Sequence, residues 1–588
     1  MTTGQTALKL LRYRPGLFLA TIFFRGLDDI PPFFTGLIMK AFFDALTGHA
    51  DAGFTAWTLV ALFVVLEGVD RVVLFAAALV GARWYFAVQS LLRKNMLEAV
   101  LQVRHPRAVS GSSGEVTNRF RDDVQAVTSY LEQYIHLWGN MIFAGLAVSY
   151  MAKIDVAVTA VTVMPCVLII TVVNVARRHI RRFRTAQRVA TERATNFANE
   201  MFQSVLAVQV ATTEGHTVSH FRDLNEARRK STLVDNLFNQ LLMSINFNIS
   251  HISTGVILLL VADQMQAGTF SVGDFALFTT YVSEVARSGA LVGSVMAQHK
   301  RAEVSLGRMA STIEEESPAA LVAYGPIYLK ESPPPMGVVQ RSEADILHEL
   351  EITGLTHVFA GSENGVRGID LRIQPGTFNV VTGRIGAGKT TFLRTVLGVL
   401  PLQSGEIRWN GESVADPKTF FAPPRCAYTP QVPRLFSETL ADNILMGLPG
   451  GEEVLQRAVR LGVMEEDLPT LELGLETMVG PRGVKLSGGQ VQRTAAARMF
   501  VREAELYVFD DLSSALDVET ENLLWDRVFA ARQGACLVVS HRRPALQRAD
   551  QIVVLKEGRV EAVGTLQELL TSCEEMQRLW RGDLGSDG

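Results

Sequence analysis

The chain has 588 residues, which is too many for one hydrophobic core and predicts two or more domains. Hydrophobic residues make up 48% and charged residues 20%, and the mean hydropathy of +0.18 is high for a soluble protein. The net charge of −4 lacks the basic excess of a nucleic-acid-binding protein, so nucleic acid is excluded as a partner.

The first half of the chain holds about six apolar stretches that predict transmembrane helices. A bilayer core about 30 Å thick needs roughly 20 helical residues. We expect spans at about 17–39, 55–79, 136–151 with an extension back towards 131, 156–175, 241–262 and 272–297. The fourth of these carries no charge and ends in the basic run Arg177 to Arg182, as expected where a helix leaves the bilayer on the cytoplasmic side.

The distribution of basic residues predicts the topology. Neither Lys nor Arg occurs in 41–70 or 231–286, so these segments are expected to hold the outer connections after the first and fifth spans. The long charged segments 84–130 and 176–240 predict helices that continue into the cytoplasm, with a turn near 106–115. We therefore expect a multi-pass protein of the cell (inner) membrane with cytoplasmic termini. The N-terminus has no signal-peptide pattern, so the spans themselves would direct insertion.

Ionisable residues within the predicted spans allow two interpretations. They could line a substrate path, because charges in hydrocarbon are costly and tend to face cavities, or they could pair with one another. The residues are Asp28, Asp29, Glu67, Asp70, Arg71 and Glu284. A polar stripe on the fifth span fits helix contacts as well as it fits a ligand site. It comprises Asn246, Asn248, Ser250, His251 and Ser253.

A connector and a second domain follow the spans. Residues 311–348 are acidic and rich in proline, which predicts a linker without a long helix. From Leu350 onward strand-like and helix-like segments alternate, which predicts an α/β domain. We therefore expect a membrane domain over 1–310, the linker, and an α/β domain over 349–588.

The cysteines show neither metal-ligand nor disulfide-framework spacing. They are Cys166, Cys426, Cys536 and Cys573, far apart in the chain. We interpret them as packing residues in a protein that faces a reducing compartment.

A phosphate-binding loop is predicted in the second domain. Its residues follow the pattern Gly-x-x-x-x-Gly-Lys-Thr and are Gly383, Arg384, Ile385, Gly386, Ala387, Gly388, Lys389 and Thr390. In this pattern backbone N–H groups surround phosphate oxygens, the lysine reaches the outer phosphates, and the threonine hydroxyl binds Mg²⁺. The apolar residues 380–382 predict a strand before the loop. The residues from Thr391 onward predict a helix, whose N-terminus favours an anion.

Five further positions after this loop carry residues that suit the binding and hydrolysis of ATP. Gln431 lies in a proline-bounded loop and could reach Mg²⁺, and Asp510 ends an apolar strand where its carboxylate could hold the metal. Asp511 comes next, at the position of a hydrolytic base. His541 ends another apolar strand and could contact the γ-phosphate. The glycine-rich turn Leu486, Ser487, Gly488, Gly489 and Gln490 opens a helix and predicts a second anion site.

On these motifs the chain resembles the ABC transporters, in particular exporter-type half-transporters in which a membrane domain precedes the nucleotide-binding domain. The matching positions are 383–390 (Walker A), Gln431 (Q-loop), 486–490 (signature), Asp510 (Walker B), 513–517 (D-loop) and His541 (H-loop). The resemblance implies a dimer in which each ATP lies between the Walker motifs of one chain and the signature of the other. It also implies that turns near 110–121 and 199–214 act as coupling helices on the ATPase domains.

Three positions depart from the family pattern. The family usually has Glu where this chain has Asp511, and the shorter side chain retracts the carboxylate by more than about 1 Å. A misplacement of about 1 Å can cost on the order of 100-fold in rate. We expect a slow Walker site in this chain, paired in a heterodimer with an active site on a partner, rather than a homodimer with two slow sites. Phe359 is expected to stack on adenine, with His357 as the competing candidate. Pro481 stands where exporters often have Glu.

The sequence thus predicts one half of an ATP-driven exporter that works by alternating access. The substrate class is hydrophobic or amphipathic: a lipid, a drug or a peptide. The alternative is a regulatory or channel-like ABC protein in which bound ATP gates a pore without stoichiometric pumping.

Overall fold

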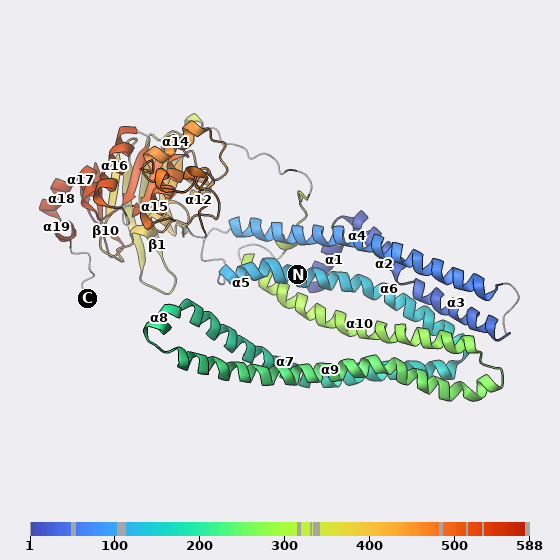
Figure 1. The fold of residues 1–588 in the computed structure, drawn as a ribbon. Coiled ribbons are helices and arrows are strands. Elements are labelled where there is room, and N and C mark those ends of the chain that lie inside the picture. The colour runs from blue at the N-terminus through green and yellow to red at the C-terminus, as the bar shows by residue number, and fades with distance from the viewer. Residues whose placement is uncertain are drawn as a thin grey trace. The chain divides into compact units, whose positions relative to one another are not determined.

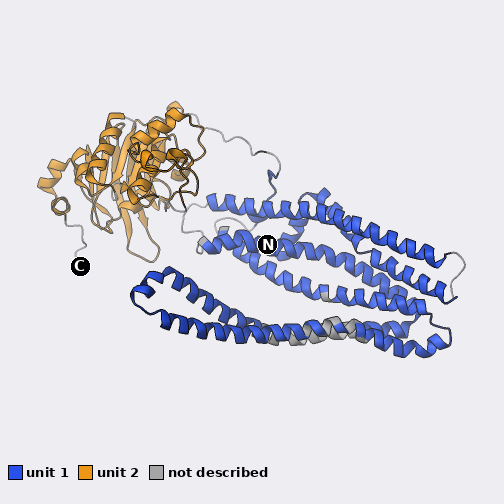
Figure 2. Ribbon diagram, viewed as in Figure 1, with its two compact units in different colours: residues 1–102, 109–331 blue, residues 103–108, 332–588 orange. Residues whose placement is uncertain are grey.

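The computed structural model describes residues 2–48, 54–102, 113–313, 319–329, 332, 341–480, 486–512, 516–531 and 534–582. The chain divides into two compact units (Figure 2), and each is described by itself. The first unit comprises residues 1–102 and 109–331, and the second comprises 103–108 and 332–588. The division after residue 331 falls inside the predicted linker.

The first unit is built from long helices (Figure 1). Short helix α1 (Thr3–Leu11) precedes α2 (Pro15–Asp28) and α3 (Pro31–Leu46). The longest helices are α4 (Ala56–Gln102), α6 (Val124–Ile154), α7 (Val156–Gln203), α9 (Glu214–Gln266) and α10 (Val272–Ala310). The short helices α5 (Ser113–Asn118) and α8 (Val205–Val210) lie within the two segments predicted as coupling turns. The six predicted spans coincide with α2 plus α3, α4, α6, α7, α9 and α10.

The first predicted span is broken into two helices. Asp29 and Ile30 separate α2 from α3, because Pro31 and Pro32 cannot donate the backbone hydrogen bonds that would continue α2. Within the described residues one helical stretch, Gly114–Ile154, passes a test of both length and apolarity for crossing a bilayer. Helix α4 carries Glu67, Asp70 and Arg71 inside its apolar half.

A single residue joins α6 to α7. Asp155 leaves the helical conformation, and its Oδ1 accepts a hydrogen bond from the Val158 N–H at 2.9 Å, which caps α7. Its Oδ2 accepts a hydrogen bond from Gln264 Nε2 of α9 at 3.2 Å. Asp155 therefore ties three helices together at one end of the bundle.

Helices α7, α8 and α9 form a long arm in which α7 and α9 pack along each other (Figure 1). Aromatic side chains contribute to this packing, with Phe183 and Phe238 at 5.4 Å between ring centroids and Phe197 and Phe221 at 6.1 Å. Such stacked and edge contacts add to the energy of apolar burial. We call this element the α7–α9 arm.

The second unit contains two sheets. A six-stranded sheet has the order β10-β9-β3-β8-β7-β6, parallel except for the β9–β10 pair. Its strands are β3 (Phe378–Thr382), β6 (Cys426–Thr429), β7 (Leu506–Asp510), β8 (Ala535–Val539), β9 (Gln551–Lys556) and β10 (Arg559–Gly564). An antiparallel sheet has the order β2-β1-β4-β5. Its strands are β1 (Leu350–Val358), β2 (Gly365–Ile373), β4 (Ser404–Trp409) and β5 (Glu412–Ser413).

The six-stranded sheet is buried on both faces. Val381 and its neighbours on one face pack against α11 (Lys389–Val396) and the antiparallel sheet, whereas Val380 and Phe509 on the other face pack against helices. Because side chains of a strand alternate between faces, such strands read as continuous apolar runs. These strands could therefore be predicted from their apolar runs in the sequence. Cys426, Cys536 and Cys573 are free and buried in these cores, as predicted; the side chain of Cys166 lies outside the described residues.

Helices surround the sheets and form a further small core beside the glycine-rich signature turn. They are α12 (Pro417–Phe420), α13 (Leu440–Leu445), α14 (Glu452–Leu461), α15 (Gly488–Phe500), α16 (Val518–Ala531), α17 (Arg543–Arg548), α18 (Leu566–Ser572) and α19 (Glu574–Arg581).

Candidate functional site

The predicted ATP-site residues gather at the carboxyl edge of the parallel strands. The P-loop 383–388 follows β3, Asp510 ends β7, and His541 follows β8 two residues after its end. Gln431 follows β6 at the same edge. Parallel neighbouring strands bring their carboxyl ends together, which is the usual place for ligands in α/β sheets.

Two glycines of the P-loop are required by close backbone approach. A Cβ on Gly383 would lie 2.3 Å from the carbonyl oxygen of Leu555, and one on Gly388 would lie 2.7 Å from Val366 Cγ1. Gly388 also has a φ of +96°, in the region that favours glycine. The loop can therefore close tightly before α11, which begins at Lys389.

Lys389 lies inside this loop and bonds to it. Its Nζ donates to the carbonyl oxygens of Gly383 at 2.6 Å and Arg384 at 2.8 Å. Burial lowers the pKa of Lys389, and the neighbouring carboxylates of Asp511 and Asp510 oppose this effect. A desolvated ammonium in a cradle of backbone groups is suited to bind a phosphate.

Thr390 and Asp510 form the pair that would hold Mg²⁺. Thr390 Oγ1 donates to Asp510 Oδ1 at 3.0 Å, and Tyr428 OH donates to Asp510 Oδ2 at 3.4 Å. Burial raises the pKa of Asp510, whereas the bond from Thr390 lowers it. A hydroxyl and a carboxylate at the mouth of a phosphate loop are the oxygen ligands that Mg²⁺ prefers, so these residues fit the metal.

Asp511 lies beside Gln431. Gln431 Nε2 is 3.4 Å from Asp511 Oδ2, whereas Asp511 Oδ1 is buried without a hydrogen-bond partner among the described residues. Asp511 has a left-handed backbone with a φ of +52°, which Asp tolerates better than most residues. Burial raises its pKa, and the charge of His541 opposes this effect. The unpartnered oxygen could accept a proton from a water molecule.

The segment after His541 is fixed by ion pairing. Arg542 Nη1 donates to Glu521 Oε2 at 2.6 Å, and the Glu521 side chain is fully buried. Arg542 also bonds to the carbonyl of Leu516 at 2.9 Å. These contacts hold the turn that carries His541. Residues 513–515 of the predicted D-loop lie outside the described residues, as does Pro481.

The signature turn caps α15. Ser487 Oγ accepts the N–H of Gln490, and Gln490 Oε1 accepts the N–H of Ser487, which forms a capping box. Gln490 Nε2 and the guanidinium of Arg493 both donate to Asp467, the latter through two bonds of 2.8 Å. The turn is thus rigidly held, with Gly488 and Gly489 in the first turn of the helix.

The candidates for adenine stacking differ in exposure. Phe359 is half-buried, while His357 is only 5% exposed and its Nδ1 lies 2.9 Å from the carbonyl oxygen of Pro401. The two rings contact edge to face at 5.0 Å. His357 therefore supports Phe359 rather than presenting its own face.

Replacing Phe359 by Ala is expected to weaken ATP binding about tenfold, because a stacked base contributes roughly 1–3 kcal/mol. Phe359→Tyr is the matched control and should bind as the wild type does, since the ring face is kept. Fluorescence titration with a labelled ATP analogue measures both. Equal ATP affinities for Phe359→Ala and the wild type would show that Phe359 does not stack on adenine.

Several site residues had not been predicted from the sequence. Tyr428 lies three residues before Gln431, and an apolar strand ending beside a polar loop could have suggested its contact with Asp510. Asp467 contacts Gln490 of the signature helix α15, and Glu575 contacts Arg384 of the P-loop. Both carboxylates lie in other segments of the chain. Neither of these carboxylates stands in a local motif.

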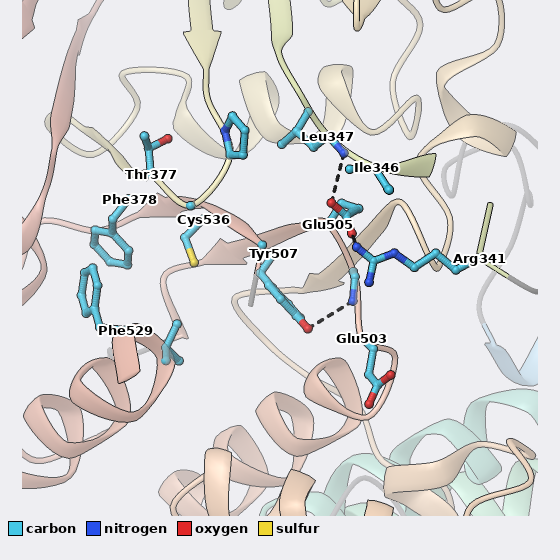
Figure 3. A pocket seen from close by; sticks show the side chains of 15 residues that line it. Arg341, Ile346, Leu347, Thr377, Phe378, Glu503, Glu505, Tyr507, Phe529 and Cys536 are labelled. Carbon is cyan, nitrogen blue, oxygen red and sulfur yellow. Dashed lines mark hydrogen bonds and ion pairs between the residues drawn. The ribbon is translucent and has the colours of Figure 1, made fainter. Parts of the chain in front are cut away.

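A separate cavity of about 800 Å³ lies at the opposite, amino-terminal edge of the sheet (Figure 3). Its polar groups are satisfied by the protein: Glu505 Oε2 accepts the N–H of Leu347 at 3.0 Å and its other oxygen pairs with Arg341, while Tyr507 OH accepts the N–H of Ala504 at 3.1 Å. This cavity is distinct from the predicted ATP site.

The charges within the predicted spans mostly pair with one another. The pairs are Arg25 with Asp28 at 3.0 Å, Arg71 with Asp70 at 2.5 Å and Glu67 at 3.9 Å, and Arg287 with Glu284. Asp29 Oδ1 accepts a hydrogen bond from Asn140 Nδ2 at 2.9 Å. On the polar stripe, Asn248 bonds to the Ser244 carbonyl of its own helix and Ser253 is buried. The side chains of Asn246 and Ser250 lie outside the described residues.

These observations define a P-loop nucleotide-binding domain fused to a domain of long membrane-type helices. Family comparison agrees: residues 17–287 match the ABC transporter transmembrane region, and residues 366–514 match the ABC transporter domain. The chain therefore belongs to the ABC transporters, with the organisation of a half-transporter.

Known proteins are similar over nearly the whole chain. The chain is 27% identical to an ATP-dependent lipid A-core flippase of Aromatoleum aromaticum, over 92% of this chain and 90% of that protein. It is 23% identical to ABC transporter C family member 3 of Arabidopsis thaliana and to ABC transporter B family member 1 of Dictyostelium discoideum, but spans only 35% and 60% of their lengths. The structure of a bacterial Atm1-family ABC exporter with ATP bound matches 98% of the chain with a TM-score of 0.75 and 19% identity. This likeness shows an exporter fold.

Proposed function

We propose that the chain is one half of a dimeric exporter that uses ATP binding and hydrolysis to move a hydrophobic or amphipathic substrate across a membrane. The observation that carries this proposal is the arrangement around the P-loop. Lys389 is buried against the loop carbonyls, and Thr390 bonds to Asp510. That arrangement has the charges and the oxygen donors that a nucleotide with Mg²⁺ requires.

Each residue has a defined part in this proposal. Lys389 exchanges its loop carbonyls for the outer phosphate oxygens, and Thr390 with Asp510 holds Mg²⁺, with Gln431 as a further ligand. The metal, when bound, offsets the negative charge of the phosphates. Asp511 orients the attacking water and His541 contacts the γ-phosphate.

The second half of each ATP site comes from a partner chain. Ser487 to Gln490 form a rigid helix start whose backbone N–H groups favour an anion. The side chain of Gln490 bonds to Asp467, and the hydrogen bonds among the described residues do not join this turn to the chain's own P-loop. We infer that these residues complete the site of the partner, so that the two ATPase domains close head to tail.

The α7–α9 arm supports a dimer. Three large apolar side chains near its turn are exposed: Phe202 at 71%, Leu206 at 73% and Val210 at 78%. Exposed apolar groups at the end of a helical arm are typical of a contact surface. We propose that α8 docks on an ATPase domain as a coupling helix.

We further propose that the partner is a different half-transporter, because Asp511 replaces the usual Glu whereas the signature turn is intact. Co-expression with a candidate half-transporter that has Glu at the position equivalent to Asp511 tests the heterodimer. ATPase activity is expected only in the mixed dimer and should survive Asp511→Ala in this chain. An active dimer of this chain alone that Asp511→Ala silences would contradict the heterodimer and make Asp511 the working base.

The alternative is ATP-gated flux without stoichiometric pumping. The slow site expected from Asp511 favours it, because bound ATP would then persist. Substrate flux that continues in vesicles with a non-hydrolysable ATP analogue would support gating. Flux that stops with this analogue supports pumping.

A further inference from the structure

A buried ion pair joins the P-loop to the C-terminal helix. Arg384 Nε lies 2.8 Å from Glu575 Oε1, and the two side chains are 11% and 4% exposed. Arg384 is the second residue of the P-loop, whereas Glu575 stands in the first turn of α19. Removing Arg384 would take the counter-charge away from the buried carboxylate of Glu575.

The same arginine also contacts the lysine of the ATP site. Its carbonyl oxygen accepts the hydrogen bond from Lys389 Nζ, and this carbonyl also accepts the Ala387 N–H at 3.1 Å. The side chain of Arg384 is thus anchored to α19 while its backbone shapes the phosphate cradle. A shift of α19 at Glu575 would displace a wall of that cradle.

Helix α19 makes a second contact with the site, through the segment that follows His541. The Arg543 guanidinium lies over the Trp580 ring at 5.0 Å from its centroid and donates to the Trp580 carbonyl at 3.0 Å. Met576 and Leu579 anchor the helix in the core that contains Ile552 of β9. One helix therefore contacts both the loop of Lys389 and the segment beside His541.

We propose that α19 is a brace for the nucleotide site, with Glu575 and Arg384 as positioning residues that hold the P-loop in the conformation that accepts the phosphates of ATP. This inference rests on the proposed use of the P-loop for ATP. The neighbouring Glu574 provides a matched control. It is 75% exposed and pairs with Arg578 one turn along the same helix.

The test compares Glu575→Gln with Glu574→Gln in the full chain in lipid. A labelled ATP analogue reports affinity, and thermal unfolding with and without ATP reports stability. Glu575→Gln is expected to lose about tenfold in ATP affinity, because the P-loop arginine would lose the charge that holds it, while Glu574→Gln binds as the wild type does. Arg384→Met should lose a similar factor, and the double variant should lose no more than either single variant.

A stability loss without ATP, combined with wild-type affinity, would show a merely structural ion pair and overturn the proposal. Additive losses in the double variant would overturn it too. If Glu575→Gln does not fold, Glu575→Asp replaces it in the test, because this variant keeps the negative charge but has a shorter side chain. Unchanged ATP affinity in Glu575→Asp would contradict the proposal that Glu575 positions the P-loop. Failure of the wild type to bind the analogue would instead refute the proposed function.

Discussion

Replacing Asp511 by Glu is expected to raise the ATP hydrolysis rate of this chain's Walker site about 100-fold. The added methylene would move the carboxylate about 1 Å towards the position where a base must contact water, and misplacements of that size cost on the order of 100-fold. The rate of phosphate release by the purified chain, or by a mixed dimer whose partner site is inactivated, measures this effect.

Asp511→Asn is the control for this gain, because it keeps the size of Asp but cannot accept the proton. Burial raises the pKa of Asp511, so its basic form is lost as the pH falls towards that raised value. Hydrolysis through Asp511 should therefore decline on acidification at a higher pH than an exposed Asp would give. A Glu variant no faster than the wild type would show that carboxylate reach does not limit the rate.

The second large effect is expected at Lys389. Lys389→Met keeps the length of the side chain but removes the buried ammonium that donates two hydrogen bonds to the loop. Loss of two charged hydrogen bonds to phosphate should weaken ATP binding by at least about 100-fold. Titration with a labelled ATP analogue measures the change.

Lys556→Met is the matched control, since Lys556 is exposed and pairs with the carboxylate of Glu561 at 3.9 Å across the hairpin of β9 and β10. It should bind ATP as the wild type does. If Lys389→Met binds ATP as tightly as the wild type, the phosphates do not bind at the P-loop. The assignment of Thr390 and Asp510 as Mg²⁺ ligands would then also fail.

The sequence predicted those parts of the site that short motifs encode. The contact between Thr390 and Asp510 followed from two motifs that stand at the carboxyl ends of β3 and β7, which are parallel strands of one sheet with β8 between them. By contrast, the ion pair of Arg384 and Glu575 joins segments far apart in the chain, and no local pattern marks either partner. The division of the first span followed from Pro31, but Leu17 to Met39 was long and apolar enough to be taken as one helix. Hydropathy reports burial in lipid and not the backbone hydrogen bonds that proline removes.

Asp155 constrains how the bundle can move. Only this residue separates α6 from α7, and its carboxylate also accepts a bond from Gln264 of α9. At that end Asp155 holds the three helices together. We therefore expect α6, α7 and α9 to move together at that end whenever the bundle changes conformation.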